Sequence, residues 1–350
     1  MKRNILILGA SYGSLLATKL AMAGHNVTMT CRNATADLIN EKGTDVRLKL
    51  RDEDTHRSFL SEDLAGDIHA TTPDKANPRD FDMIALAMQE PQYRAPEVSA
   101  LMRRIAASGK PCLSIMNMPP LPFLARIPGV NAAQLRSAFS CPEVWEGFEP
   151  GLMSLCSPDP QAFRPPEEEA NVLHVGLPTN FKAAEFADPA HTEMLQQLAN
   201  DIEAVRVDGK DVPVKLRVHD SLFTPLAKWS MLLTGNYRCI TEADPQSIRD
   251  AVHGDPELSL SVYAWVDSLA QKLGAAPQDQ VPFEKYARAA SSLLKPSSAA
   301  RAIAAGSTNI ERVDRLVQAL AASQDMHHPE VDRIVDLVDH RLSTQVTQAA

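Results

Sequence analysis

The chain has 350 residues, of which 44% are apolar and 23% charged, and its formal net charge is −9. This composition is typical of a globular protein, and the length predicts two domains, since one domain usually holds about 100–200 residues. The acidic balance argues against a nucleic-acid or anionic-membrane partner, which would need a basic footprint, and no run of about 18 apolar residues predicts a membrane span.

The first 32 residues predict a strand, a turn, a helix and a second strand. Ile5–Leu8 is a short continuous apolar run ended by Gly9, the pattern of a buried parallel strand. Apolar residues at helical spacing follow in Ser14–Ala23, and Gly24 ends this helix. Residues 26–30 are again β-prone, so the N-terminus predicts one βαβ unit.

Two more buried strands and a helix between them are expected farther along the chain, at residues 82–87, 112–116 and 96–107. This alternation predicts a mostly parallel sheet covered by helices. Residues 141–215 are rich in proline, and strands are expected there at 172–175 and 205–207. We interpret this stretch as the far part of the first domain, with antiparallel strands and long loops.

From about residue 219 nearly every segment has helical periodicity, at residues 225–237, 256–273, 283–294, 309–322 and 329–342. The sequence therefore predicts an α/β protein with two domains. Residues 1–218 form a Rossmann-type, doubly wound dinucleotide-binding domain. Residues 219–350 form an all-helical domain that binds the substrate and carries the catalytic groups.

The turn between the first strand and the first helix is a candidate phosphate-binding site. Residues without bulk let the backbone approach a pyrophosphate, and the helix N-terminus offers N–H groups to its charge. The pattern lacks the middle glycine of a G-x-G-x-x-G motif, so a small-residue turn without a ligand is the alternative. The expected cofactor-binding residues are Gly9, Ala10, Ser11, Tyr12 and Gly13.

Arg32 follows the second strand, where an acidic residue would bind the ribose 2′-hydroxyl of NAD. An arginine can instead pair with a 2′-phosphate, and no Asp or Glu occurs between Gly24 and Thr35. Arg32 therefore favours NADP(H) as the cofactor, the alternative being a solvated surface arginine.

Four stretches of the sequence resemble the ketopantoate reductase family. They are GHNVTMTCRNATADLINEKG (Gly24–Gly43), FDMIALAMQEPQ (Phe81–Gln92), CLSIMN ending at Asn117, and AKWSMLLTGN with Lys228 and Asn236 eight residues apart. Near the C-terminus, Ser297-Ser298 and Glu311 resemble the family's substrate-binding segment. The resemblance implies NADPH-dependent reduction of a 2-oxo acid, with Gln89 and Asn117 beside the cofactor.

The resemblance also implies that the substrate is bound by Asn117, Asn236, Ser298 and Glu311. Glu311 is expected to open the helix over 309–322, where a first-turn acid also has a purely structural reason to occur. Ser291-Ser292 is a rival alignment for the serine pair. The family's lysine is replaced by Gln89, and its asparagine one turn beyond Lys228 by Leu232. The resemblance thus implies a 2-dehydropantoate 2-reductase or a relative with a changed substrate, and we expect ketopantoate to be a poor substrate.

Lys228 is the expected catalytic residue. Reduction of a carbonyl needs a proton donor at the oxygen, and the family resemblance places Lys228 there. The neighbouring residues are apolar all round, which predicts a buried helix, and a buried lysine needs a reason. In an α-helix, Lys228 and Asn236 are about 80° apart, so both can face one side. Pro225 is expected to open this helix, with Thr224 as its cap.

Two other functions remain open. An opine-type dehydrogenase would reduce an imine formed from a keto acid and an amine. A non-catalytic NADP-binding protein would keep the turn and lose turnover. No metal site is expected, since His327 and His328 are adjacent and lack ligand spacing. The five cysteines include no C-x-x-C pair, which suits a reducing, cytoplasmic setting, and a homodimer is a further expectation.

Overall fold

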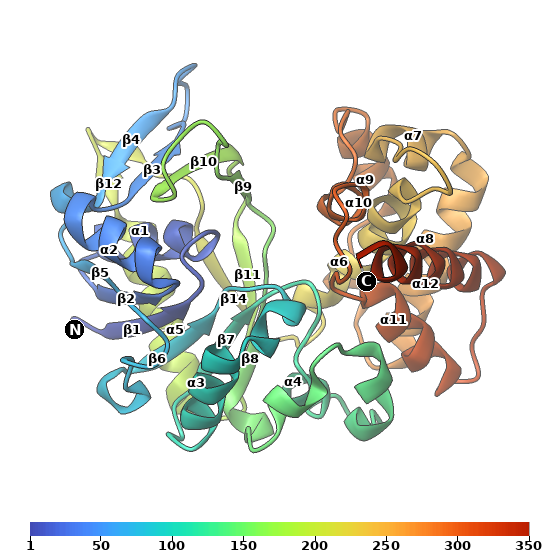
Figure 1. Ribbon diagram of the computed structural model, residues 1–350, viewed down its shortest axis with the longest axis horizontal. Helices are drawn as coiled ribbons and strands as arrows, with labels where there is room; N and C mark the ends of the chain where they lie inside the picture. Colours follow the sequence, from blue (N-terminus) through green and yellow to red (C-terminus); the bar gives the residue numbers. More distant parts are fainter. Residues whose placement is uncertain (350) are drawn as a thin grey trace. The chain divides into compact units, whose positions relative to one another are not determined.

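The computed structural model describes residues 1–349 and divides into two compact units, each with its own packing (Figure 1). The first unit comprises residues 1–88, 92–123 and 143–220, and the second comprises 89–91, 124–142 and 221–350. The sequence predicts one domain boundary, at residue 218. The structure differs in that two earlier segments, 89–91 and 124–142, pack with the helical unit. One of them carries the 3₁₀ turn Ala132–Ala138, which packs on α11 (Val313–Ala322).

The first unit is built on a mostly parallel eight-stranded sheet, which confirms the predicted Rossmann-type fold class. All neighbouring strands are parallel except β8 and β11, which are antiparallel. The spatial order is β14 (Leu216–His219), β11 (Phe181–Ala184), β8 (Met153–Ser157), β7 (Cys112–Ile115), β6 (Met83–Leu86), β1 (Asn4–Leu8), β2 (Asn26–Thr30) and β5 (Ile68–Thr71).

Three helices pack on the strands of this unit, α1 (Gly13–Met22), α2 (Asn33–Lys42) and α5 (Pro189–Ala204). The unit also holds α3 (Pro96–Ala106), and the short α4 (Leu121–Leu124) ends at the first residue of the next segment of the second unit. The β1-α1-β2 unit matches its prediction within one residue at each end. Helix α5 packs on α1 and β14 through its buried face, which consists of Leu195, Leu198, Ala199 and Ile202.

A second, smaller sheet lies in the first unit, in the order β4 (Arg57–Leu60), β3 (Asp45–Leu48), β10 (Val172–Leu177) and β9 (Gln161–Phe163). Strand β10 is parallel to β3 and antiparallel to β9. A two-stranded ribbon, β12 (Arg206–Val207) with β13 (Lys210–Asp211), follows α5. The predicted strands at 172–175 and 205–207 are thus present, but the stretch 141–215 also holds a parallel strand, β8, and a 16-residue helix.

The second unit is helical, as predicted, but its elements differ in detail. They are α6 (Lys228–Met231), α7 (Ile248–His253), α8 (Pro256–Lys272), α9 (Phe283–Ala290), α10 (Ser298–Ala304), α11 and α12 (Pro329–Ala349). The sequence interpretation missed α7 and α10 and ended α12 too early. None of the described helices is both long enough and apolar enough to cross a membrane.

Candidate functional site

In the first unit, four neighbouring parallel strands end at the same edge of the sheet. Strand β1 lies between β6 and β2, and β7 lies on the other side of β6. The chain runs from β1 to β2 on one side of β1 and later returns to β6 on the other side. In open α/β sheets, ligands bind at such a switch point, beyond the carboxyl ends of the strands. Gly9, Arg32 and Asn117 all follow strands of this group.

The turn after β1 depends on its two glycines. Gly9 has a φ of 102°, and a Cβ there would lie 2.7 Å from Met88 Cγ and 2.8 Å from the Ala87 carbonyl oxygen. A Cβ on Gly13 would lie 2.7 Å from Ile7 Cγ2, so α1 packs tightly on β1. These are the requirements of the first and last glycines of a dinucleotide-binding turn, which allow the sharp turn and close helix packing.

The three residues between these glycines differ in exposure. Ala10 is buried, Ser11 is exposed at the surface, and Tyr12 is half-buried. The Tyr12 ring packs edge-on against Phe181, with centroids 6.0 Å apart, and its hydroxyl donates to the Pro160 carbonyl at 2.8 Å. Burial raises the pKa of the Tyr12 hydroxyl. Tyr12 therefore anchors the turn to the segment after β8, and Ser11 is the residue of the turn that presents a free surface.

Arg32 lies at the start of α2, where it is exposed and extended, with φ −64° and ψ 150°. A second arginine, Arg164, reaches the same turn from the segment after β9 and donates to the Ala10 carbonyl at 2.8 Å. The sequence interpretation missed Arg164, because it lies 154 residues from its partner. Nothing in the local pattern around Arg164 relates it to the turn.

The two residues that the sequence predicts beside the cofactor, Asn117 and Gln89, belong to different units. Asn117 lies two residues after the end of β7 and is half-buried, with the fully buried Met118 after it. Gln89 follows β6 but belongs to the second unit, together with Glu90 and Pro91. The structure therefore places Asn117 with the turn and Arg32 in the first unit, and Gln89 with the helical residues.

In the second unit, Lys228 begins α6 within a buried segment, as the sequence predicts. Lys228 is half-buried, and its neighbours Ala227 and Trp229 are 4% and 1% exposed. A 3₁₀ turn over Thr224–Ala227 with Pro225 near its start precedes α6. Thr224 does not cap it, contrary to expectation, because its hydroxyl donates to the Asp279 carboxylate at 3.2 Å instead.

The segment after α6 is a π-helical turn, Leu232–Asn236, rather than the regular α-helix expected from the sequence. The Tyr237 amide donates to the Leu232 carbonyl, five residues back. A π-turn holds more residues than an α-turn, so each residue advances by less than about 100° around the axis. The offset of about 80° expected between Lys228 and Asn236 is therefore reduced, and the two residues lie closer to one face.

Two side chains donate to carbonyl groups of this region, one from α9 and one from the 3₁₀ turn Tyr237–Cys239 that directly follows the π-turn. The Tyr286 hydroxyl of α9 donates to the Met231 carbonyl at 3.1 Å, and a Cβ on Gly235 would collide with that hydroxyl. The Arg238 guanidinium donates to the Thr234 carbonyl at 3.4 Å. Since π-turns interrupt the regular α-helical hydrogen-bond ladder, such side-chain donors stabilise them.

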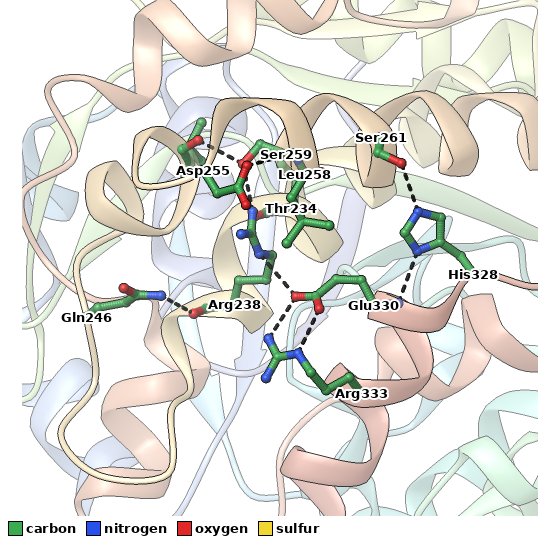
Figure 2. A network of polar contacts seen from close by, with 11 residues as sticks. Thr234, Arg238, Gln246, Asp255, Leu258, Ser259, Ser261, His328, Glu330 and Arg333 are labelled. Carbon is green, nitrogen blue, oxygen red and sulfur yellow. Dashed lines mark hydrogen bonds and ion pairs between the residues drawn. The ribbon is translucent and has the colours of Figure 1, made fainter.

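Arg238 belongs to a buried polar network that ties the turn to α8 and α12 (Figure 2). Its guanidinium donates to the Ser259 hydroxyl at 2.7 Å and lies 3.4 Å from the Glu330 carboxylate. Both charged side chains are almost fully buried, at 8% and 9% exposure. Glu330 also pairs with Arg333, at 2.7 Å, while His328 contacts Ser261 at 3.1 Å.

The predicted substrate-binding residues of the second unit lie next to the π-turn. Ser297 caps α10 and donates its hydroxyl to the Asn236 carbonyl at 2.7 Å. This structural role uses the buried Ser297 hydroxyl, whereas the Ser298 side chain is exposed. The rival pair lies elsewhere, at the end of α9, where Ser292 donates to the Ala289 carbonyl.

Glu311 does not open a helix, contrary to expectation, since α11 begins at Val313. The Tyr237 hydroxyl holds the preceding segment by donating to the Glu311 carbonyl at 2.5 Å and accepting from the Val313 amide at 2.9 Å. Tyr237 is the residue after Asn236, so this contact joins Glu311 to the π-turn. Glu311 is 9% exposed, and its carboxylate accepts a hydrogen bond from the Glu90 amide at 3.4 Å.

Glu90 is a buried carboxylate that the sequence interpretation did not single out. It is 1% exposed and accepts hydrogen bonds from the Ser140 amide and hydroxyl and from the Cys141 amide, at 2.5–3.2 Å. Neutral donors thus satisfy this carboxylate, and they fix the loop 89–91 in the second unit. Only its position beside Gln89 could have drawn attention to it.

No model of a known protein family matches the sequence, and the search of curated proteins gave no match. Solved structures do match. A 2-dehydropantoate 2-reductase from Methylococcus capsulatus has a TM-score of 0.68 at 13% identity, covering 97% of this chain and 98% of that one. A dimeric ketopantoate reductase from Staphylococcus aureus has a TM-score of 0.60 at 10% identity, covering 98% and 99%.

A D-mandelate dehydrogenase in complex with NADH is also similar, with a TM-score of 0.59 at 12% identity over 98% of this chain and 99% of that one. These matches extend over nearly the whole of each chain. The similarity in fold to ketopantoate reductases, which the sequence motifs implied, is therefore confirmed. At such low identity it concerns the fold, and the chemistry must be argued from the residues.

Proposed function

We propose that this protein is an NADP(H)-dependent oxidoreductase that reduces a small 2-oxo acid to the corresponding 2-hydroxy acid. The observation that carries the proposal is the grouping of polar residues around the π-turn that follows Lys228. Hydrogen bonds join Asn236 to Ser297, and join Tyr237, its neighbour, to Glu311. Both bonds are accepted by backbone carbonyls, so they fix the segments that carry the Asn236 amide and the Glu311 carboxylate. Together with Lys228, these side chains are suited to a polar, oxygen-rich substrate.

The first unit fits a dinucleotide. The tight turn at Gly9, the close helix packing at Gly13 and the arginine after β2 are what a pyrophosphate and a 2′-phosphate require. The nicotinamide, when bound, supplies a hydride to the carbonyl carbon. Asn117 is the residue that we assign to the nicotinamide side, because it follows β7 at the same sheet edge.

Lys228 holds the proton that the reduction consumes. As the carbonyl oxygen gains negative charge, a proton moves from Lys228 Nζ to that oxygen, and solvent then returns a proton to Lys228 for the next turnover. Asn236 and Ser298 bind the oxygens of the substrate. Leu232 is 4% exposed and apolar where the related motif has asparagine, so we expect an acid more apolar than ketopantoate.

An imine substrate is the second candidate, and the Glu311 carboxylate favours it, since a buried carboxylate beside the π-turn could bind an ammonium group.

A homodimer is part of the proposal, because one protein of similar fold is described as dimeric. We also propose a reducing, cytoplasmic location, since all five cysteines are free thiols.

A substrate panel tests this proposal. NADPH oxidation is followed by absorbance with a series of 2-oxo acids, each with and without amino acids, and NADH is run in parallel. Turnover of 2-oxo acids alone supports the reductase, whereas turnover that requires an amine supports the imine-reducing enzyme. Tight NADPH binding without turnover of any compound would replace both with a non-catalytic NADP-binding protein.

A further inference from the structure

We propose that Arg164 forms, together with Arg32, a two-arginine site for the 2′-phosphate of NADP(H), and that it is therefore a determinant of cofactor specificity. This inference rests on the proposed function, which assigns the turn Gly9–Gly13 to a dinucleotide. It adds the residue that follows β9 of the second sheet, in a stretch outside the motifs that resemble ketopantoate reductases.

Arg164 is fixed at the turn by its backbone contact. One of its terminal nitrogens donates to the Ala10 carbonyl at 2.8 Å, and the side chain is half-buried. A guanidinium carries five N–H donors in a planar fork, so this single bond leaves most of them available. The bond therefore positions the charged group at the start of the turn, where it can still bind an anion.

The segment that carries Arg164 is held against the same turn by a second contact. The Tyr12 hydroxyl donates to the Pro160 carbonyl at 2.8 Å, four residues before Arg164. Asp159, next to Pro160, pairs with Lys182 of β11 at 3.1 Å. Two independent contacts thus define where the guanidinium lies, which is the preorganisation that a specific anion site needs.

The charges around Arg164 favour an anionic ligand. Burial lowers the pKa of Arg164, and the nearby Arg32 guanidinium lowers it further. Among residues 1–349, no carboxylate forms an ion pair with Arg164 or Arg32. Cys31 interacts electrostatically with Arg164, and burial raises the pKa of the Cys31 thiol to about 11, so it is neutral near pH 7. Two neighbouring arginines without a counter-ion are unfavourable unless a ligand supplies one.

The position of the two arginines selects the 2′-phosphate over the pyrophosphate. In dinucleotide-binding folds the pyrophosphate lies at the N-terminus of the first helix, here α1, whereas the adenosine ribose lies by the end of the second strand. Cys31 and then Arg32 follow the last residue of that strand, Thr30. Arg164 is electrostatically coupled to both of these residues and contacts Ala10, which precedes the helix.

Direct binding measurements test the assignment. We would measure dissociation constants for NADP⁺, NAD⁺, adenosine 2′,5′-bisphosphate and 5′-AMP by calorimetry, on the full chain and on Arg164→Met. Loss of a charge-assisted contact should weaken NADP⁺ and the bisphosphate about 10-fold to 100-fold. NAD⁺ and 5′-AMP should change less than about 2-fold, since neither carries the 2′-phosphate.

Two further variants make the comparison specific. Arg51→Met removes an equal charge from an exposed arginine that has no ion pair among the described residues, and should leave all four constants unchanged. Arg164→Lys keeps the charge without the planar fork and should give an intermediate loss. Because both arginines bind one phosphate, the losses in Arg32→Ala and Arg164→Met should not multiply in the double variant.

Several results would overturn the assignment. Equal weakening of NADP⁺ and NAD⁺ in Arg164→Met, with an unchanged melting temperature, would make Arg164 a support of the turn. Unchanged NADP⁺ affinity would remove it from the site altogether. If the native chain binds no dinucleotide, this inference and the proposed function both fail, whereas NADP⁺ binding without any turnover refutes only the catalytic half of the proposed function.

Discussion

The Tyr286 hydroxyl donates a 3.1 Å hydrogen bond to the Met231 carbonyl, and Gly235 is the residue that leaves room for this hydroxyl. Tyr286 is almost fully buried and comes from α9, more than 50 residues from the carbonyl that it contacts. The π-turn that brings Lys228 and Asn236 toward one face is therefore fixed by tertiary packing.

Gly235→Ala should destabilise the native chain, because the added methyl group collides with the Tyr286 hydroxyl. Overpacking of this kind costs about 1–3 kcal/mol. In a Tyr286→Phe background the same change should cost much less, since the next-nearest atoms, Ile248 Cγ2 and Tyr286 Cζ, are 3.2 and 3.3 Å from the new Cβ. Urea unfolding of the four proteins measures this coupling, and strictly additive costs would contradict it.

Glu330→Gln should lower the free energy of unfolding by about 3–5 kcal/mol, because it leaves the buried Arg238 guanidinium without its counter-charge. Arg333→Ala removes the other arginine that pairs with Glu330, but that side chain is 58% exposed. Its loss should cost less than about 1 kcal/mol. Chemical denaturation of both variants provides the comparison, and equal losses would rule out the buried pair as the stabilising contact.

Lys19 of α1 gives a pH-dependent prediction. It is fully buried and donates to the Pro213 carbonyl at 2.9 Å and the Val212 carbonyl at 3.4 Å. Burial, aided by the nearby Lys215, lowers its pKa to about 7, and Glu203 opposes this shift. Between that value and about 10.5 the unfolded chain binds one proton more than the folded chain, so stability rises with pH.

The measurement compares the native chain with Lys19→Met by urea unfolding at pH 7 and pH 9. Over these two units the stability of the native chain relative to the variant should rise by about 2 kcal/mol, since each pH unit contributes about 1.4 kcal/mol at most. Because the free energy of unfolding is compared with that of the variant at the same pH, the contributions of other groups that titrate between pH 7 and pH 9 cancel. Parallel stability curves for the two proteins would mean that Lys19 has an ordinary pKa in the fold.

Local patterns were sufficient to predict the β1-α1-β2 unit. The apolar run Ile5–Leu8, the helical spacing after it and the terminating Gly24 each specify one element, and the structure agrees within a residue. Helix α5 had comparable signals, with Asp188 capping it and Pro189 in its first turn. It was missed because the surrounding prolines suggested loops, although its buried residues recur at helical spacing.

Other features have no local cause that a single sequence could reveal. The π-turn depends on the Tyr286 hydroxyl of α9, and the non-helical segment at Glu311 depends on the Tyr237 hydroxyl. Arg164 reaches the turn across 154 residues. In each of these cases a long-range hydrogen bond overrides, or adds to, what the neighbouring residues favour, so only the tertiary structure could identify it.

Leu232→Asn should increase kcat/KM for ketopantoate relative to that for a more apolar 2-oxo acid of similar size. Leu232 is buried within the π-turn, at the position where the related motif carries an asparagine. An added amide can bind a substrate hydroxyl, and a polar contact of this kind discriminates by about 1–3 kcal/mol. Steady-state kinetics with both acids test this, and an unchanged ratio would remove Leu232 from the determinants of specificity.

Lys228→Met should abolish turnover while the protein still folds and still binds NADP⁺. Lys228 belongs to the second unit, whereas the turn, Arg32 and Arg164 belong to the first, so the dissociation constant for NADP⁺ should change little. Methionine keeps an apolar stem of similar length, which limits the packing loss in this buried segment. Removal of a positioned proton donor should lower kcat by about 10²-fold to 10⁴-fold.

Lys285→Met is the matched control for Lys228→Met, because it removes an exposed lysine from the same unit and should leave kcat unchanged. Melting temperatures of both variants show whether a loss of activity reflects unfolding. Full activity of Lys228→Met on the best substrate of the panel would mean that another group donates the proton. A rise in KM at constant kcat would instead make Lys228 a substrate-binding residue, since uniform binding affects KM alone.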